Sequence, residues 1–322
     1  MTDIKKKTRA ILLTVCFILF QGLSACNTDG RDPGDTTLDH TDAVPLTSAP
    51  ATPTPEPEFN VDTDNKLEVH FMDAGEGECT LVFTPDGKTL LVDGGTADFG
   101  QAVITFLRSR NVRKLDIVVS SHPDADRIGG LAALIKEFRI GRFFAPPVGN
   151  DIPEFSNMLA AMSDADLNQE TANAGLEVPL GAQVQLKFLA PMSTGYDHLN
   201  DYSVMLQVIY GNTRILFTGD AESVSEKQVL SSGSSLASTV LKVGNNGASA
   251  STSQEFLTAV APMYAVIFTK PGDEAVPSKI LLDKLNQLKV KWYKTGECGI
   301  ISFYSDGTNI ELKTQKSPPK RT

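Results

Sequence analysis

The stretch SHPDADRIGG, at residues 121–130, lies between an apolar, β-branched run at residues 115–120 and a segment rich in Leu and Ala at residues 128–138. The first of these patterns predicts a strand and the second predicts a helix. Polar side chains at such a junction lie at the C-terminal end of the strand, where proteins with alternating strands and helices usually build their sites. The stretch therefore predicts a functional loop at the edge of a sheet.

Three other loops occupy the same position in the pattern, because each follows an apolar strand and carries polar residues. They are DGG at residues 93–95, TGDAE at residues 218–222 and GNNGA at residues 244–248. Four loops of this kind indicate one site assembled from separate parts of the chain.

The rest of the pattern predicts two halves, each a set of strands with helices on the outside, which together form an α+β fold with four layers in the order αββα. Strands are expected at residues 67–72, 79–84, 89–92, 115–120, around 176–189, and at 204–210, 213–218, 238–243, 264–269, 289–293, 300–304 and 309–313. Helices are expected at residues 101–110, 128–138, 153–162, 223–230, 254–260 and 278–287.

The amino-terminal residues 1–25 have the pattern of a secretory signal, with basic residues 5–9 before an apolar run at residues 10–20. That run is too short to cross a bilayer, which takes roughly 20 helical residues. The sequence LSAC at residues 23–26 resembles the lipobox of bacterial lipoproteins, which implies that Cys26 carries a lipid. The expected location is extracytoplasmic, anchored to the cell membrane. The alternative is a signal peptidase site that happens to precede a Cys.

Residues 26–65 are predicted to form a disordered tether, because residues 27–65 contain eight Thr, six Pro and nine acidic residues against one base. Such a composition buries too little apolar surface to offset the entropy of ordering. One folded domain is expected at residues 66–314, followed by a basic, solvated tail at residues 315–322.

Charge and cysteine content narrow the class of protein. The formal net charge is −10, which disfavours a surface that binds nucleic acid. In the expected domain only Cys79 and Cys298 remain, and their strand-like surroundings favour two buried free thiols over a disulfide, although an exported protein could form one.

The four loops in order, with the opening FMDAGEGE at residues 71–78, resemble the metallo-β-lactamase superfamily, and specifically the soluble domain of the ComEC-like competence DNA-uptake proteins. The resemblance covers residues 67–312. It implies a four-layered αββα sandwich and a dinuclear site, often zinc, that activates water for hydrolysis. In the family the metals are held by a His-x-His-x-Asp-His loop, a later Asp after Gly, and a Gly-His-His-Gly loop.

The chain keeps only part of that ligand set. His122, Asp126 and Asp220 match the family pattern. Asp124 stands in place of the second His of the first loop, and Arg127 stands in place of the last. Since a guanidinium has no lone pair to donate, Arg127 cannot replace a histidine ligand.

Asn245 and Asn246 replace the His pair of the last loop, and an amide is a poor zinc ligand beside imidazole. The second metal position is therefore expected to be lost. Asp126 and Asp220 would then be neighbouring carboxylates with no cation between them, which is unfavourable. The hypothesis is that the Arg127 guanidinium bridges them and occupies the space of the lost metal.

The first metal position stays open to two interpretations. The expectation is a hydrogen-bonded polar pocket without a cofactor. The alternative is one divalent ion, manganese, magnesium or zinc, on His122, Asp124 and Asp220, with Asp126 as a further ligand. In that case the protein is a hydrolase of the phosphodiesterase type, with Arg127 meeting part of the substrate charge.

The remaining candidates have weaker signals. Asp126 and Asp220 are the candidates for catalysis if any remains. Asp73 and Asp93, at strand ends, are expected to orient the pocket loops by accepting backbone N–H bonds. His198, in a loop, is a possible extra ligand, while His70 alternates with apolar neighbours in a strand and is expected to be structural.

The residues together favour a lipid-anchored, metallo-β-lactamase-like protein whose dinuclear centre has degenerated into a structural or binding pocket. Two alternatives remain: the mononuclear hydrolase described above, and a cell-surface scaffold for protein interactions. The expected partners are the membrane, through the lipid, and an unknown envelope partner or small ligand.

Overall fold

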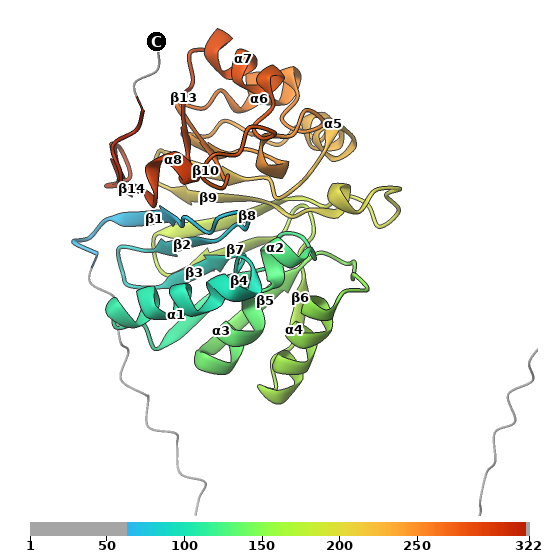
Figure 1. Cartoon of the computed structure of the whole chain (residues 1–322), viewed down its shortest axis with the longest axis vertical. Helices are drawn as coiled ribbons and strands as arrows, with labels where there is room; N and C mark the ends of the chain where they lie inside the picture. The colour runs from blue at the N-terminus through green and yellow to red at the C-terminus, as the bar shows by residue number, and fades with distance from the viewer. Residues whose placement is uncertain (1–62, 320–322) are drawn as a thin grey trace, which may run out of the picture. The chain divides into compact units, whose positions relative to one another are not determined.

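Two β-sheets stacked face to face form the centre of the fold in the computed structural model, which describes residues 63–319. Helices cover the outer face of each sheet (Figure 1). The layers follow the order helix, sheet, sheet, helix, so the α+β, four-layered αββα sandwich is confirmed.

The first sheet has eight strands in the order β15-β14-β1-β2-β3-β4-β5-β6, with parallel pairing from β3 to β6 and antiparallel pairing elsewhere. Its strands are β1 (Leu67–Phe71), β2 (Thr80–Phe83), β3 (Thr89–Val92), β4 (Lys114–Val119), β5 (Arg139–Ala145), β6 (Gln169–Thr171), β14 (Ile301–Ser305) and β15 (Ile310–Thr314).

The second sheet has seven strands in the order β13-β12-β11-β10-β9-β8-β7, with parallel pairing from β10 to β13. Its strands are β7 (Glu177–Leu180), β8 (Val184–Ala190), β9 (Met205–Tyr210), β10 (Thr213–Phe217), β11 (Val240–Lys242), β12 (Tyr264–Ile267) and β13 (Lys291–Lys294).

Three helices pack on the outer face of each sheet. On the first sheet they are α1 (Gly100–Ser109), α3 (Leu131–Glu137) and α4 (Pro153–Asp164), and on the second α5 (Ser223–Ser231), α6 (Gln254–Val260) and α7 (Lys279–Gln287). Shorter elements are α2 (Ala125–Ile128), α8 (Thr295–Cys298), η1 (Ala97–Phe99), η2 (Leu199–Tyr202) and η3 (Asn245–Gly247).

Aromatic side chains join the two sheets at the centre of the sandwich. Phe71 on β1 is fully buried, and its ring centroid lies 5.8 Å from that of Phe217 on β10 and 6.1 Å from that of Phe268, which directly follows β12. Buried rings at these separations contribute both apolar burial and ring-to-ring attraction. The contact holds the two sheets, and the loops at their ends, in one arrangement.

The helix predicted at residues 128–138 is interrupted by Gly129 and Gly130, so that α2 and α3 are separate. The reason is a close approach of the DGG loop. A Cβ at Gly130 would lie 2.2 Å from the Gly94 carbonyl oxygen, and one at Gly129 would lie 2.5 Å from the Ala97 nitrogen. The two glycines therefore set how closely α2 approaches the loop after β3.

Most of the other predicted elements are present close to their expected bounds. The sequence did not predict β5, β6 and α8. In β5 the charged Arg139 and Arg142 flank Gly141, which obscures the apolar pattern. Parallel pairing with β4 along most of the strand makes this segment extended, and that pairing depends on tertiary structure.

The folded part begins slightly before the expected boundary at residue 66. Thr63 is buried, and its hydroxyl donates to the carbonyl oxygens of Thr84 and Pro85. At the other end, Gln315 and Lys316 of the expected tail still donate backbone bonds to Ile300 and Cys298. The predicted signal at residues 1–25, the lipidated Cys26 and almost all of the tether lie outside the described residues.

Both cysteines of the domain are buried and form no disulfide with each other, as the sequence favoured. Burial raises the pKa of the Cys79 thiol, which leaves it unreactive. Among residues 63–319, no helix has the length and apolarity needed to span a bilayer.

Candidate functional site

The four polar loops meet at one end of the sandwich. Asp93 follows β3, residues 121–130 follow β4, Asp220 follows β10 and η3 follows β11. Because β3 pairs with β4 and β10 with β11 in parallel, the C-terminal ends of each pair lie side by side. The structure therefore brings together loops from both halves of the chain.

Arg127, on α2, lies at the centre of this site with 1% of its surface exposed. Its Nη2 donates to Asp220 Oδ1 at 2.5 Å and lies 3.1 Å from Glu78 Oε1, while Nη1 donates to the carboxylate of Asp126. The same Nη2 lies 2.7 Å from Asn246 Oδ1, which accepts from it. The bridge between Asp126 and Asp220 that the sequence suggested is present, and Glu78 and Asn246 extend it.

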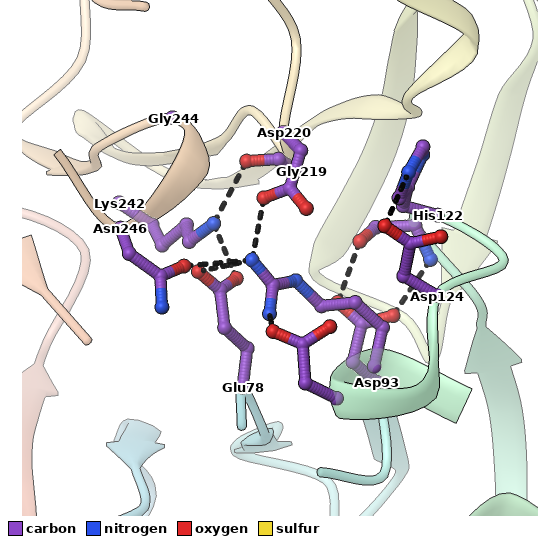
Figure 2. A network of polar contacts seen from close by, with 12 residues as sticks. Glu78, Asp93, His122, Asp124, Gly219, Asp220, Lys242, Gly244 and Asn246 are labelled. Carbon is purple, nitrogen blue, oxygen red and sulfur yellow. Dashed lines mark hydrogen bonds and ion pairs between the residues drawn. The ribbon is translucent and has the colours of Figure 1, made fainter. Parts of the chain in front are cut away.

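A second buried cation lies beside the first. Lys242, at the end of β11, is 2% exposed, forms an ion pair with Glu78 and donates to the Gly219 carbonyl oxygen at 2.8 Å. Figure 2 shows Glu78, Lys242 and Asn246 on one side of Asp220, and His122 with Asp124 on the other. Glu78 thus connects the two cations.

Sequence reasoning assigned no role to Glu78 or Lys242. One signal could have found Lys242, since it is the only charged residue in the otherwise apolar run at residues 240–243. A charged residue in a short apolar strand followed by a polar loop is rarely buried unless it is paired. The sequence around Glu78 does not indicate that this residue is buried, because Glu78 ends a glycine-rich turn, where an exposed carboxylate is equally common.

The charge states of the carboxylates around Arg127 and Lys242 depend on burial and on ion pairing. Burial raises the pKa of Glu78 to about 7, with Arg127 and Lys242 opposing the increase. Burial acts in the same direction on Asp220, but there the attraction of Arg127 and Lys242 prevails and lowers the pKa of the carboxyl below its usual value. Asp220 is therefore the carboxylate that the cations hold ionised.

Asp93 holds the loop after β4 in place. Its Oδ1 accepts from the backbone nitrogen of Ser121 at 2.7 Å and its Oδ2 accepts from the Ser121 hydroxyl at 2.6 Å. Burial raises the pKa of Asp93 to about 6, although these hydrogen bonds favour the ionised form. This geometry matches the orienting role expected for Asp93.

His122, Asp124 and Asp220 form a separate group whose ligand atoms all lie within 4.8 Å of one another. His122 is fully buried, with Nδ1 3.3 Å from the Ser203 hydroxyl. Its Nε2 lies 3.2 Å from Asp124 Oδ2 without hydrogen-bond geometry, and it has no other partner among residues 63–319. Asn150 fixes Asp124 from the other side, donating to Oδ1 at 2.9 Å.

Two other predicted residues, Asp126 and Asn245, lie beside Arg127 and Lys242 but are not part of the group of His122, Asp124 and Asp220. The Asp126 carboxylate is bound by Arg127, and burial raises its pKa. Asn245 contributes its backbone nitrogen, which donates to the Gly219 carbonyl oxygen at 3.1 Å.

Two others lie elsewhere. Asp73 lies 3.5 Å from Lys316 and lines a different groove, beside α1, so the structure does not bring it into this pocket. His198 is exposed just before η2, outside the group of His122, Asp124 and Asp220.

Comparison with known proteins identifies the family. The sequence profile described as "Metallo-beta-lactamase superfamily" matches residues 72–270, which is more than half of the chain. The chain belongs to the metallo-β-lactamase superfamily.

Two relatives belong to the ComEC-like branch of the superfamily. It is 26% identical to ComE operon protein 3 of Bacillus subtilis over 73% of the chain and 33% of that protein. It is 29% identical to Competence protein ComA of Neisseria gonorrhoeae over 74% of the chain and 32% of that protein. The chain thus spans about a third of these relatives, and the resemblance to the ComEC-like branch is confirmed.

A solved metallo-β-lactamase fold protein, YhfI from Bacillus subtilis, is also similar. Its structure covers 70% of the chain and 95% of its own, at 14% identity with a TM-score of 0.47.

A dinuclear metallo-β-lactamase centre does not fit these residues. The Arg127 guanidinium lies between Asp126 and Asp220, and it offers no lone pair to a metal. Asn246 turns its oxygen to Arg127. One divalent ion does fit the remaining group, because His122 Nε2 is buried without a hydrogen-bond partner and two carboxylates stand beside it.

Removing the Arg127 charge is expected to destabilise the fold strongly. Arg127→Met leaves Asp220 and Glu78 buried with one cation fewer, and breaking a buried ion pair costs about 3–5 kcal/mol. The control is Arg108→Met, which breaks the exposed pair with Glu137 and is expected to cost about 1 kcal/mol or less. Urea denaturation of both variants measures the difference, and equal losses would show that Arg127 has no central role.

Stability is expected to fall as pH rises through about 7, because of Glu78. Folding raises its pKa, so its contribution is fully present below about 4.5 and is lost between there and about 7. One such group gives a slope of at most about 1.4 kcal/mol per pH unit. Glu78→Gln should flatten the slope measured by denaturation at several pH values, whereas the exposed Glu255→Gln should keep it. An unchanged slope in Glu78→Gln contradicts this account.

Proposed function

We propose that the protein is a lipid-anchored, extracytoplasmic member of the ComEC-like metallo-β-lactamases whose dinuclear centre has become a structural and ligand-binding pocket. Organic cations of the chain replace the metals that the family uses. In this interpretation the protein is not a hydrolase at this site, and it acts by binding a small ligand or an envelope partner.

One observation carries this proposal, namely the buried guanidinium of Arg127 with its three carboxylate partners. It is buried, and it contacts carboxylates from both halves of the sandwich, Glu78 and Asp126 from one and Asp220 from the other. Both terminal nitrogens bind carboxylates, and the remaining Nε is itself buried, so the guanidinium is held in place and is not free to turn toward a substrate. Arg127 is thus a structural cation, which argues against the substrate-binding role that a hydrolase would give it.

The charge of the pocket also argues against an anionic substrate. On its solvent side the Asp124 and Asp126 side chains are 42% and 36% exposed. Acidic groups outnumber the fixed cations Arg127 and Lys242; they are Glu78, Asp93, Asp124, Asp126 and Asp220. A phosphodiester approaching these exposed carboxylates would meet like charge, which disfavours nucleic acid as the ligand.

A second candidate function is supported by the unpartnered nitrogen of His122. His122, Asp124 and Asp220 would hold one divalent ion, manganese, magnesium or zinc, and such an ion supplies Lewis-acid activation of a phosphoester and of water. In that case Asn150 and Ser203 hold Asp124 and His122 in position. The two candidates make opposite predictions about metal content.

We expect the purified full chain to retain well under one metal ion per molecule after incubation with manganese, magnesium or zinc and removal of free ions. Elemental analysis measures the content, and bis(p-nitrophenyl) phosphate hydrolysis with each added metal measures activity, which is expected to stay at background. The physical reason is that Arg127 already neutralises Asp220, a shared ligand of the proposed ion.

Stoichiometric metal with turnover would overturn the proposal in favour of the mononuclear hydrolase. In that outcome Asp124→Asn should abolish both metal and turnover, because it removes an accessible ligand with little change in shape. The control is Asp283→Asn, an exposed residue on α7 whose carboxylate pairs with Lys279.

The lipid anchor is tested separately at Cys26, which lies outside the described residues. We expect the wild-type chain to fractionate with membranes and Cys26→Ser to be released from them, because a lipid on this residue supplies the membrane affinity. Mass spectrometry of the mature amino terminus checks for the lipid. A wild-type chain found without lipid and without its first 25 residues would support signal-peptide cleavage alone.

A further inference from the structure

A second cluster of reactive side chains lies on the outer face of the first sheet, away from the Arg127 pocket. His70 on β1 stands directly opposite Ser302 on β14, and Ser302 stands opposite Lys313 on β15. The Ser302 hydroxyl lies 2.8 Å from His70 Nδ1, and His70 Nε2 lies 2.9 Å from Glu68 Oε2. Serine, histidine and carboxylate are thus connected in sequence by hydrogen bonds.

The carboxylate decides where the protons lie. Although burial acts to raise it, hydrogen bonds from His70 and Arg110 lower the pKa of Glu68, so this side chain is ionised and can only accept. The proton on neutral His70 is therefore on Nε2, which donates to Glu68. His70 Nδ1 is left with a lone pair, and the Ser302 hydroxyl donates to it. This is the proton arrangement of a serine with a general base and an orienting acid.

Aromatic rings hold the imidazole in this orientation. His70 is 3% exposed, and its ring makes edge contacts with Phe83, Phe106 and Tyr304 at centroid distances of 5.7, 5.6 and 5.9 Å. Arg110 fixes Glu68 from the other side at 2.8 Å and stacks over the Phe83 ring. The base and its orienting carboxylate are therefore rigid before any ligand arrives.

Ser302 opens onto a groove of about 280 Å³ between α1 and β15. The groove offers apolar surface at Phe106 and Ile300, and a cation at Lys313, the cross-strand neighbour of Ser302. Lys313 has most of its side chain exposed, lies over the Tyr304 ring and pairs with the exposed Glu311 at 3.3 Å. The groove thus combines a surface for a short acyl chain with positive charge beside the serine.

We propose that Ser302, His70 and Glu68 form an esterase-type site for small carboxylic esters, independent of the Arg127 pocket. Ser302 Oγ bonds to the ester carbonyl carbon while its proton passes to His70 Nδ1, and Glu68 stabilises the imidazolium. The bond to the alcohol oxygen breaks, and the alcohol leaves with that proton, giving acyl-Ser302. Water then attacks the acyl carbon, its proton moves through His70 to Ser302 Oγ, and the carboxylic acid is released.

Lys313 supplies positive charge where the carbonyl oxygen becomes negative during both steps. Glu68 is a positioning residue, since it acts through His70. None of these reaction steps requires a metal ion.

The experiment treats the full chain with a biotinylated fluorophosphonate, which forms a covalent bond to activated serines, and locates the label by peptide mass spectrometry. We expect the label on Ser302 and hydrolysis of p-nitrophenyl butyrate above background. Ser302→Ala should lose both. Ser109→Ala, which removes a serine of the adjacent groove that has no histidine beside it, should lose neither.

Two further measurements separate this site from a structural hydrogen-bond network. Glu68→Gln should lower kcat by about 10- to 100-fold with KM little changed, because it weakens the base and leaves the groove intact. Activity should persist in EDTA and in Asp283→Asn, an exposed residue on α7. A wild-type protein that takes no label at Ser302 and shows no hydrolysis would overturn the proposal, as would turnover that survives Ser302→Ala or is abolished by EDTA.

Discussion

The buried guanidinium of Arg127 is the interaction on which the site depends. It contacts Asp126 beside it, Glu78 before β2 and Asp220 after β10, and so it ties together segments from both halves of the sandwich. Three carboxylates this close would repel one another and would be costly to bury without a cation between them. The position of α2, fixed by glycines against the loop after β3, is what delivers the cation to this point.

Much of this arrangement could be predicted from sequence, because it follows from local pattern and charge type. The loops at residues 93–95, 121–130, 218–222 and 244–248 were recognisable as ends of apolar strands, and parallel pairing brings such ends together. A cation at residue 127 in place of a ligand implied a partner for Asp220. Neither inference needed side-chain coordinates.

The residues that were missed depend on tertiary contacts. Lys242 and Glu78 meet only because β11 and the turn before β2 come from opposite sheets that pack together, and neither strand pattern reports on the other. β5 was missed for a similar reason, since its charged and glycine residues form a strand through pairing with β4. His70 was expected to be structural, and its hydrogen bond to Ser302 joins residues 232 positions apart, which no local pattern reports.

Lys242 and Arg127, at the end of the sandwich where the loops meet, are parts of the chain itself. An ion held by ligands exchanges with its surroundings, so its occupancy depends on supply and on competing scavengers. A charged side chain, in contrast, is part of every copy of the protein and does not exchange. Arg127 and Lys242 therefore neutralise these carboxylates in every molecule of the protein, whatever the supply of trace metals.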